Sequence, residues 1–257
     1  YPSSGPWWND RRYKIVTRAI DSVTLYGPTY STKTFICDRT APDSVSTNPS
    51  APGGSGSFYG GAALATISGT AEDNVSYGIV QSVEFALKDL SKPNTFWVAG
   101  TWQVGEGWTS ATVSPAQSVI WQFNFSAYTG MLTDGTSYSI YSRGYDATVP
   151  FNRESSYTTA VFTWDSQPGV STITYPVHNG DAVGSPVFEG KYIDTILSKG
   201  KRVEIKLLAK TGTNEGLYWK GGATWVATLA DADWPSTASA GYYSVETGTW
   251  TITGPVG

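Results

Sequence analysis

The strongest constraint on the fold of this chain is that its sequence repeats. The segment Tyr13–Asp21, YKIVTRAID, recurs 125 residues later as Tyr138–Asp146, YSIYSRGYD. Farther along, Phe96–Trp102, FWVAGTW, is matched by Tyr218–Trp225, YWKGGATW, at a similar separation. A period of about 125 residues corresponds to a whole domain per repeat, and not to the short units of a solenoid.

The repeat predicts three segments. Residues 1–42 are the C-terminal strands of a first repeat, 43–167 are one complete repeat, and 168–257 are the N-terminal part of a third. Short junctions containing Pro42 and Pro168 favour extended backbone and therefore a stiff rod. The two partial repeats would expose open sheet edges. Two explanations stay open: the chain is a section of a longer polypeptide, or residues 170–257 of one molecule are completed by residues 1–41 of the next, as in donor-strand polymerisation.

Composition indicates that each repeat is built from β-strands. Aromatic residues make up 14% of the chain, and the 28 glycines contrast with a single methionine. Aromatic and β-branched side chains pack well on a pleated sheet. Because there is one cysteine, no disulfide can form within the chain, and its cores must hold together by packing alone.

A short motif identifies the type of β-domain. Leu132, Gly135, Tyr138 and Ile140 have the spacing of a tyrosine corner, in which the Tyr hydroxyl bonds to upstream backbone. In the earlier segment Trp7 and Asp10 replace the Leu and Gly before Tyr13 and Ile15, which is a looser match. The motif resembles those of immunoglobulin and fibronectin type III sandwiches.

The chain as a whole resembles the tandem immunoglobulin-like repeats of large bacterial cell-surface proteins. The residues that carry the resemblance are Tyr13, Arg18, Asp21, Phe35, Asp38, Pro42, Tyr218, Trp219 and Trp225. The resemblance implies an all-β fold of tandem immunoglobulin-like or fibronectin type III-like β-sandwich repeats, at an extracellular cell-surface location. Its implied partners are neighbouring repeats or identical chains, arranged head-to-tail.

Acidic residues near the junctions are candidates for calcium ligands. They are Asp21, Asp38, Asp43, Glu72, Asp73, Asp146 and Asp165. Carboxylates gathered at a domain joint could share a hard cation and stiffen the joint. The alternative is that these residues only cap turns, since Asp often bonds its own backbone. No other cofactor is expected.

The aromatic hairpins are candidates for binding surface glycans. Trp97, Trp102, Trp219 and Trp225 could stack on sugar rings if they were exposed. Adjacent aromatics such as Phe96 and Trp97 must point to opposite faces, so at least one of each pair is expected in a core. Cross-strand aromatic packing is therefore the preferred interpretation.

Several classes of function are disfavoured. The net charge of −4 and the 15% of charged residues argue against nucleic-acid binding. No apolar run reaches the roughly 18–20 residues of a membrane span, and the N-terminal residues lack a signal-peptide pattern, so we expect any targeting segment to lie outside this sequence. The one histidine, His178, has no partner motif for catalysis. A glycoside hydrolase that uses a pair of carboxylates stays open as a third class of function.

These observations predict a non-enzymatic structural or adhesive spacer, a stiff rod or filament of β-sandwich repeats at the cell surface. The alternative function is a carbohydrate-binding module array of a secreted enzyme or adhesin.

Overall fold

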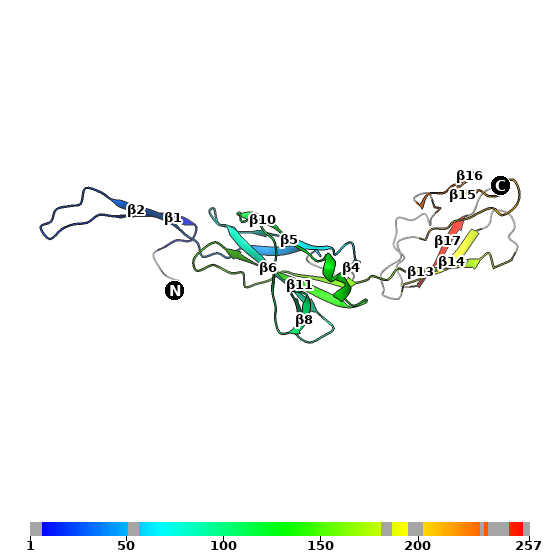
Figure 1. Cartoon of the computed structure of the whole chain (residues 1–257), viewed down its shortest axis with the longest axis horizontal. Helices are drawn as coiled ribbons and strands as arrows, with labels where there is room; N and C mark the ends of the chain where they lie inside the picture. The colour runs from blue at the N-terminus through cyan, green and yellow to red at the C-terminus, as the bar shows by residue number, and fades with distance from the viewer. Residues whose placement is uncertain are drawn as a thin grey trace. The chain divides into compact units, whose positions relative to one another are not determined.

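The structure is a computed structural model that describes residues 7–50, 57–180, 187–194, 203–231, 234–235 and 247–253. The fold class is all-β, with several open sheets and one short 3-10 helix in the described part of the chain (Figure 1). The chain divides into two compact units, Tyr1–Trp164 and Asp165–Gly257. The first unit thus contains both the predicted segment 1–42 and most of the predicted segment 43–167.

The first unit begins with an antiparallel hairpin. Strand β1 (Arg11–Thr17) pairs with β2 (Ser31–Cys37), and Tyr13 lies opposite Phe35. The rings of Tyr13 and Phe35 stack with centroids 5.5 Å apart, and Trp7 packs edge-on against both. Aromatic packing of this kind supports the pairing of the two strands.

Two sheets enclose the main core of the first unit. The smaller sheet has the strand order β10-β5-β3 and the larger β4-β12-β11-β6-β7-β8, with β9 on β6. The bounds are β3 (Asp43–Asn48), β4 (Phe58–Tyr59), β5 (Thr66–Glu72), β6 (Val80–Asp89), β7 (Thr95–Val98), β8 (Thr101–Val104), β9 (Thr109–Ser110), β10 (Ser118–Asn124), η1 (Ser126–Met131), β11 (Ser137–Asp146) and β12 (Thr159–Trp164). Alternate residues of each strand point inward, so Phe85 of β6 and Trp121 of β10 meet with stacked rings.

The second unit has a smaller described core. Strands β13 (Val170–Tyr175), β14 (Val187–Ile193) and β17 (Thr247–Thr253) form one sheet, and β15 (Tyr218–Gly221) pairs with β16 (Thr224–Val226) as a hairpin. The sequence pattern predicts a further strand over 202–207. The structure describes this segment from Val203, and assigns no strand there; Leu207 accepts a hydrogen bond from the Trp219 N–H at 3.0 Å.

An indole packed on a glycine occurs in the three-stranded sheet of each unit. Trp121 lies against Gly69 in the first unit, and Trp250 lies against Gly190 in the second; a Cβ at either glycine would overlap with the indole and with a neighbouring carbonyl oxygen. The indole N–H groups donate to equivalent carbonyls, Trp121 to Thr70 at 3.2 Å and Trp250 to Lys191 at 3.3 Å. These glycines are required because the indole occupies the volume of a side chain.

The predicted tyrosine corners form the same hydrogen bonds. The Tyr138 hydroxyl accepts the N–H of Thr133 at 2.8 Å, and the Tyr13 hydroxyl accepts the N–H of Trp8 at 2.7 Å. The preceding turns agree as well, because Gly135 and Asp10 both have positive φ, 73° and 56°. Asp is one of the few residues that tolerate this left-handed conformation, so its replacement of Gly leaves the corner intact.

The indole–glycine contact predicts a large effect of one added methyl group. Gly69→Ala should destabilise the first unit by about 3 kcal/mol or more, because neither the Trp121 indole nor the Val45 carbonyl can move out of the packed core. Urea unfolding followed by tryptophan fluorescence measures this loss. Gly61→Ala is the matched control: no atom lies within 4 Å of its Cβ position, and a change within about 0.5 kcal/mol is expected. Equal effects of the two substitutions would contradict the described packing.

Candidate metal centre

Three aspartates from distant parts of the sequence meet in the first unit. Asp38 follows β2, Asp73 follows β5, and Asp146 ends β11. Each offers a carboxylate oxygen, and these oxygens lie within 4.8 Å of one another. Asp38 belongs to the segment that leads from the β1–β2 hairpin into β3, whereas the other two belong to the sandwich. We call these three residues the joint triad.

The most enclosed member of the joint triad has an unpaired oxygen. Asp73 is fully buried. Its Oδ1 accepts the N–H of Val75 at 3.4 Å, and the nearby N–H of Ile79 also lowers the pKa of the carboxyl group, but no group reaches Oδ2 with hydrogen-bond geometry. The carboxyl group lies so close to Gly78 that a Cβ there would overlap with it. A buried carboxylate oxygen without a partner is costly, and this one lies beside two further carboxylates.

The Asp146 carboxylate is held in place by the loop that follows β11. Its Oδ1 accepts the N–H and hydroxyl of Thr148 at 3.1 and 2.7 Å and the N–H of Asn152 at 2.7 Å. The Asn152 amide donates to Asp146 Oδ2 at 2.6 Å and to the Asp38 carbonyl at 3.2 Å. Asn152 therefore links the sandwich loop to the backbone of the joint.

Burial and mutual repulsion disfavour three ionised carboxyls here. Burial, assisted by the charges of Asp38 and Asp146, raises the pKa of Asp73 to about 6. Burial and the charges of Asp146 and Asp10 also raise the pKa of Asp38. Both pKa shifts have the same cause, the free-energy cost of placing negative charges close together in a buried site, and a bound proton or a bound cation lowers this cost.

The donor set fits a calcium ion. Calcium binds six to eight oxygens at about 2.3–2.6 Å, so two ligands on opposite sides of the ion are separated by about 5 Å. The 4.8 Å limit on the oxygen separations is compatible with such a shell.

The structure does not bring the other predicted acidic ligands into the joint triad. Asp43 and Glu72 are exposed cross-strand partners in β3 and β5. Asp21 Oδ1 accepts the backbone N–H groups of Val23 and Leu25, and Asp165 Oδ1 accepts that of Gln167. For Asp21 and Asp165 the structure thus shows turn-capping bonds, the alternative weighed from the sequence.

Two residues near the joint triad were not predicted. Asp10 accepts the N–H and the hydroxyl of Ser76, both at 2.9 Å, and so ties the β1–β2 hairpin to the loop after Asp73. Asn152 bridges Asp146 and Asp38, as described above. Asp10 occupies the position of Gly135 in the tyrosine-corner motif, and this departure from the motif could have marked Asp10 as a residue with a further role. No signal in a single sequence points to Asn152.

Glycan stacking by Trp97 and Trp219 is incompatible with the structure. The two indoles are 0% and 2% exposed, respectively, so neither presents a ring face. Trp102 stacks on Tyr138 with centroids 5.6 Å apart, and Trp225 is partly buried against the second core. Packing, the interpretation preferred from the sequence, describes the buried Trp97 and Trp219, whereas Trp102 and Trp225 are partly exposed.

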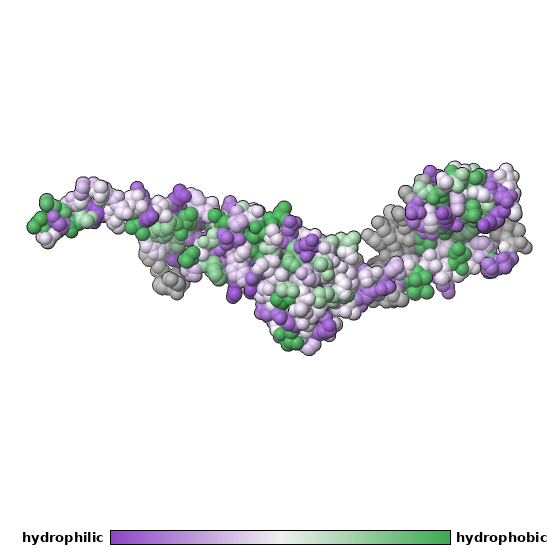
Figure 2. Space-filling model, viewed as in Figure 1, coloured by the Kyte–Doolittle hydropathy of each residue, from purple (hydrophilic) through white to green (hydrophobic). Residues whose placement is uncertain are grey.

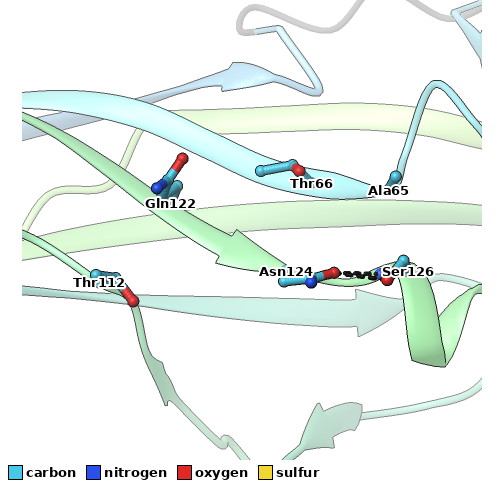
Figure 3. A pocket seen from close by; sticks show the side chains of 6 residues that line it. All are labelled: Ala65, Thr66, Thr112, Gln122, Asn124 and Ser126. Carbon is cyan, nitrogen blue, oxygen red and sulfur yellow. Dashed lines mark hydrogen bonds between the residues drawn. The ribbon is translucent and has the colours of Figure 1, made fainter.

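A shallow polar pocket lies on the outer side of β5 and β10 (Figure 3). Its volume is about 480 Å³, and it is lined by Ala65, Thr66, Thr112, Gln122, Asn124 and Ser126. These residues carry no titratable group. Asn124 Oδ1 accepts the N–H and hydroxyl of Ser126 at 3.1 and 2.6 Å, which organises the turn into η1. The lining thus presents hydroxyl and amide groups, and no carboxyl, imidazole, amine or thiol group.

Comparisons with known proteins leave the family of the chain open. No protein-family model matches it, and no curated protein matches it. Among solved structures, the chain is similar to one described as "Ca2+-stabilized adhesin helps an Antarctic bacterium reach out and bind ice", with 12% sequence identity and a TM-score of 0.27. The match covers 96% of this chain and 57% of that chain. At this TM-score the likeness establishes neither fold nor role. Within the described residues, no helix is both long and apolar enough to cross a membrane.

The raised pKa of Asp73 predicts how stability depends on pH without divalent cations. Between the ordinary pKa of 3.8 and about 6, the folded state binds more protons than the unfolded state, so the free energy of unfolding should fall as pH rises through this window. Asp73→Asn should reduce this slope and raise the melting temperature at neutral pH in EDTA, because an amide can donate to the neighbouring carboxylates. The control Asp43→Asn removes an exposed carboxyl and should leave the slope unchanged. Identical pH profiles for the wild type and Asp73→Asn would contradict the assignment.

Proposed function

We propose that this chain is a non-enzymatic structural spacer of tandem immunoglobulin-like repeats at the cell surface, and that a calcium ion held by the joint triad stiffens the link between its first two repeats. The observation that carries the proposal is the buried, unpaired Oδ2 of Asp73, which lies among two other carboxylates where the hairpin segment meets the sandwich.

The repeat organisation is supported by contacts that recur at matching positions. The pairs Tyr13–Phe35 and Tyr138–Phe162 have the same place in their hairpins. The pairs Gly69–Trp121 and Gly190–Trp250 have the same place in their three-stranded sheets. The recurrence of the same backbone partners at positions this far apart supports a common plan for these segments.

A joint of this kind suits a spacer because it connects two bodies at several points. The Asp10–Ser76 and Asn152–Asp38 hydrogen bonds already join the hairpin segment to the sandwich. Arg12 adds a cation–π contact, with its guanidinium 5.0 Å from the Tyr77 ring centroid. A cation bound by Asp38 and by the two sandwich aspartates would add a strong ionic bond across the same joint.

Calcium should therefore stabilise the joint measurably. At a calcium concentration a hundredfold above the dissociation constant, binding to the folded state adds about 2.7 kcal/mol of stability. We expect a higher melting temperature in calcium than in EDTA, and slower proteolytic cleavage between residues 38 and 43. Differential scanning calorimetry and limited proteolysis measure the two effects.

Matched variants separate a specific site from general charge screening. Asp38→Asn and Asp146→Asn should each remove most of the calcium response, whereas Asp43→Asn and Glu72→Gln should retain it. Magnesium at the same concentration controls for ionic strength. A calcium response of equal size in all four variants, or none in the wild type, would refute the proposed site.

A further inference from the structure

The sequence contains two triplets of the form Asn-x-Ser, which is the pattern of an N-glycosylation acceptor. They are Asn74–Ser76, NVS, and Asn124–Ser126, NFS. A glycan requires an asparagine at the surface, and both asparagines are exposed. Because such triplets often arise by chance, the pattern alone does not separate an acceptor from an ordinary surface residue. The hydrogen bonds of the two serines do separate them.

In the second triplet the serine donates both of its hydrogen-bonding groups to the asparagine. Asn124 ends β10 and Ser126 begins η1. Asn124 Oδ1 accepts the N–H of Ser126 at 3.1 Å and its hydroxyl at 2.6 Å (Figure 3). The Nδ2 of Asn124 forms no hydrogen bond to any other described residue. The amide oxygen is therefore held by two donors, while the amide nitrogen is free to react.

This arrangement favours the chemistry of N-glycosylation. The nitrogen of a side-chain amide is a poor nucleophile because its lone pair is delocalised into the C=O group. Loss of an Nδ2 proton as the nitrogen attacks makes the lone pair available and places negative charge on Oδ1. Hydrogen-bond donors directed at an oxygen on which charge develops stabilise the transition state. Ser126 supplies two such donors to Asn124.

In the first triplet the serine is engaged elsewhere. Ser76 donates its N–H and its hydroxyl to the carboxylate of Asp10, both at 2.9 Å. Neither group is therefore directed at the amide oxygen of Asn74. The residues on either side of Asn74, Asp73 and Val75, are buried, so this segment is held by the packing of the joint. The structure thus favours Asn124 over Asn74 as an acceptor.

The surroundings of Asn124 are suited to a sugar. Asn124 lines the polar pocket of about 480 Å³, together with Thr66, Thr112 and Gln122. The side chains of these three residues form no hydrogen bond to any other described residue. Hydroxyl and amide groups both donate and accept hydrogen bonds, as the hydroxyl groups of a sugar require. A sugar attached to Asn124 would therefore find polar partners directly beside it.

We propose that Asn124 is an N-glycosylation site and that the first sugar of the glycan lies in this pocket. The sugar comes from a glycosyl diphosphate, whose carrier is a lipid or a nucleoside. Asn124 Nδ2 attacks the anomeric carbon, and the new C–N bond forms as the bond from that carbon to the diphosphate oxygen breaks. The diphosphate leaves with the electron pair, and the Nδ2 proton passes to a carboxylate of the glycosyltransferase.

A glycan at this position covers the outer face of β10. Ile120, Gln122 and Asn124 alternate along the strand and share its outward face. Ile120 is 73% exposed, and Figure 2 shows apolar residues exposed among polar ones on the surface of the first unit. Strand β10 is also the edge of its three-stranded sheet. A bulky, hydrophilic glycan beside it reduces the contact of this strand with other molecules.

Mass spectrometry of the full chain, isolated from its own cells, tests the proposal. Proteolytic fragments that contain Asn124 should carry a glycan, and those that contain Asn74 should not. The attached sugar identifies the carrier, because a lipid carrier delivers a preassembled oligosaccharide and a nucleotide delivers a single sugar. Asn124 without a glycan, or Asn74 modified to the same extent as Asn124, overturns the proposal.

Variants expressed in the same cells test the role of the serine. Ser126→Ala should lower the glycosylated fraction at Asn124 by about tenfold or more, because it removes one of the two donors to Oδ1. Ser126→Thr retains the hydroxyl and should be glycosylated like the wild type, and so should the matched control Ser76→Ala. Ser126 is exposed, so all three variants should fold, which their melting temperatures check. Equal glycosylation of Ser126→Ala and the wild type would refute the assigned role.

The outcome is independent of the proposed calcium site. Thr66, the cross-strand partner of Asn124, lies seven residues before Asp73 in the sequence, which is roughly 20 Å along an extended strand. The calcium response of the joint triad is measured on the unglycosylated chain as well, so the spacer function and the glycosylation site are judged separately.

Discussion

The cores of this protein depend on an indole that lies flat against a glycine of the neighbouring strand. Trp121 and Trp250 occupy space that any side chain at Gly69 or Gly190 would need. In the first unit Phe85 stacks between Trp121 and Trp97, with ring centroids 6.4 and 6.2 Å away. With one cysteine in the chain, no disulfide within it can join the two sheets, so the fit of a few large rings must hold them together.

Local patterns in the sequence were sufficient to predict much of the fold. The tyrosine corner is a short motif with a fixed hydrogen bond, and both predicted corners form it. The alternation of Val83, Phe85 and Leu87 with polar residues predicts that these three side chains share the inward face of one strand, and all three are buried in the main core. The pattern over 202–207 is equally clear, and in the part of this segment that the structure describes, from Val203 onward, it corresponds to isolated bridges and single backbone hydrogen bonds. A strand is defined by its hydrogen-bonded neighbours as well as by its own residues, so alternation alone does not predict the length of a strand.

The candidate metal centre was predictable only as a set of residue types. Seven acidic residues were singled out from their positions near junctions and turns, and three of them converge within 4.8 Å. Asp38 and Asp146 are more than a hundred residues apart, so their meeting is set by sheet topology and not by spacing. Asn152 was missed because its role depends on the backbone of Asp38, which no side-chain pattern records. For the tryptophans the sequence was more informative, because adjacent aromatics indicated that one of each pair is core, and Trp97 and Trp219 are buried.

If the chain is exported and binds calcium as proposed, the carboxylate cluster has a consequence for the stiffness of the joint on either side of the membrane. Sites on extracellular modules typically have dissociation constants of about 10⁻⁴–10⁻³ M, far weaker than those of cytosolic calcium buffers. A site of that strength would hold protons or remain charged inside the cell, and the hairpin segment would be held to the sandwich by its hydrogen bonds and the Arg12–Tyr77 contact without the ion. Only on reaching a calcium-rich medium would the ion fix the angle at Asp38. If the cell-surface role proposed above holds, the joint would be weaker during export and stiffer at its destination.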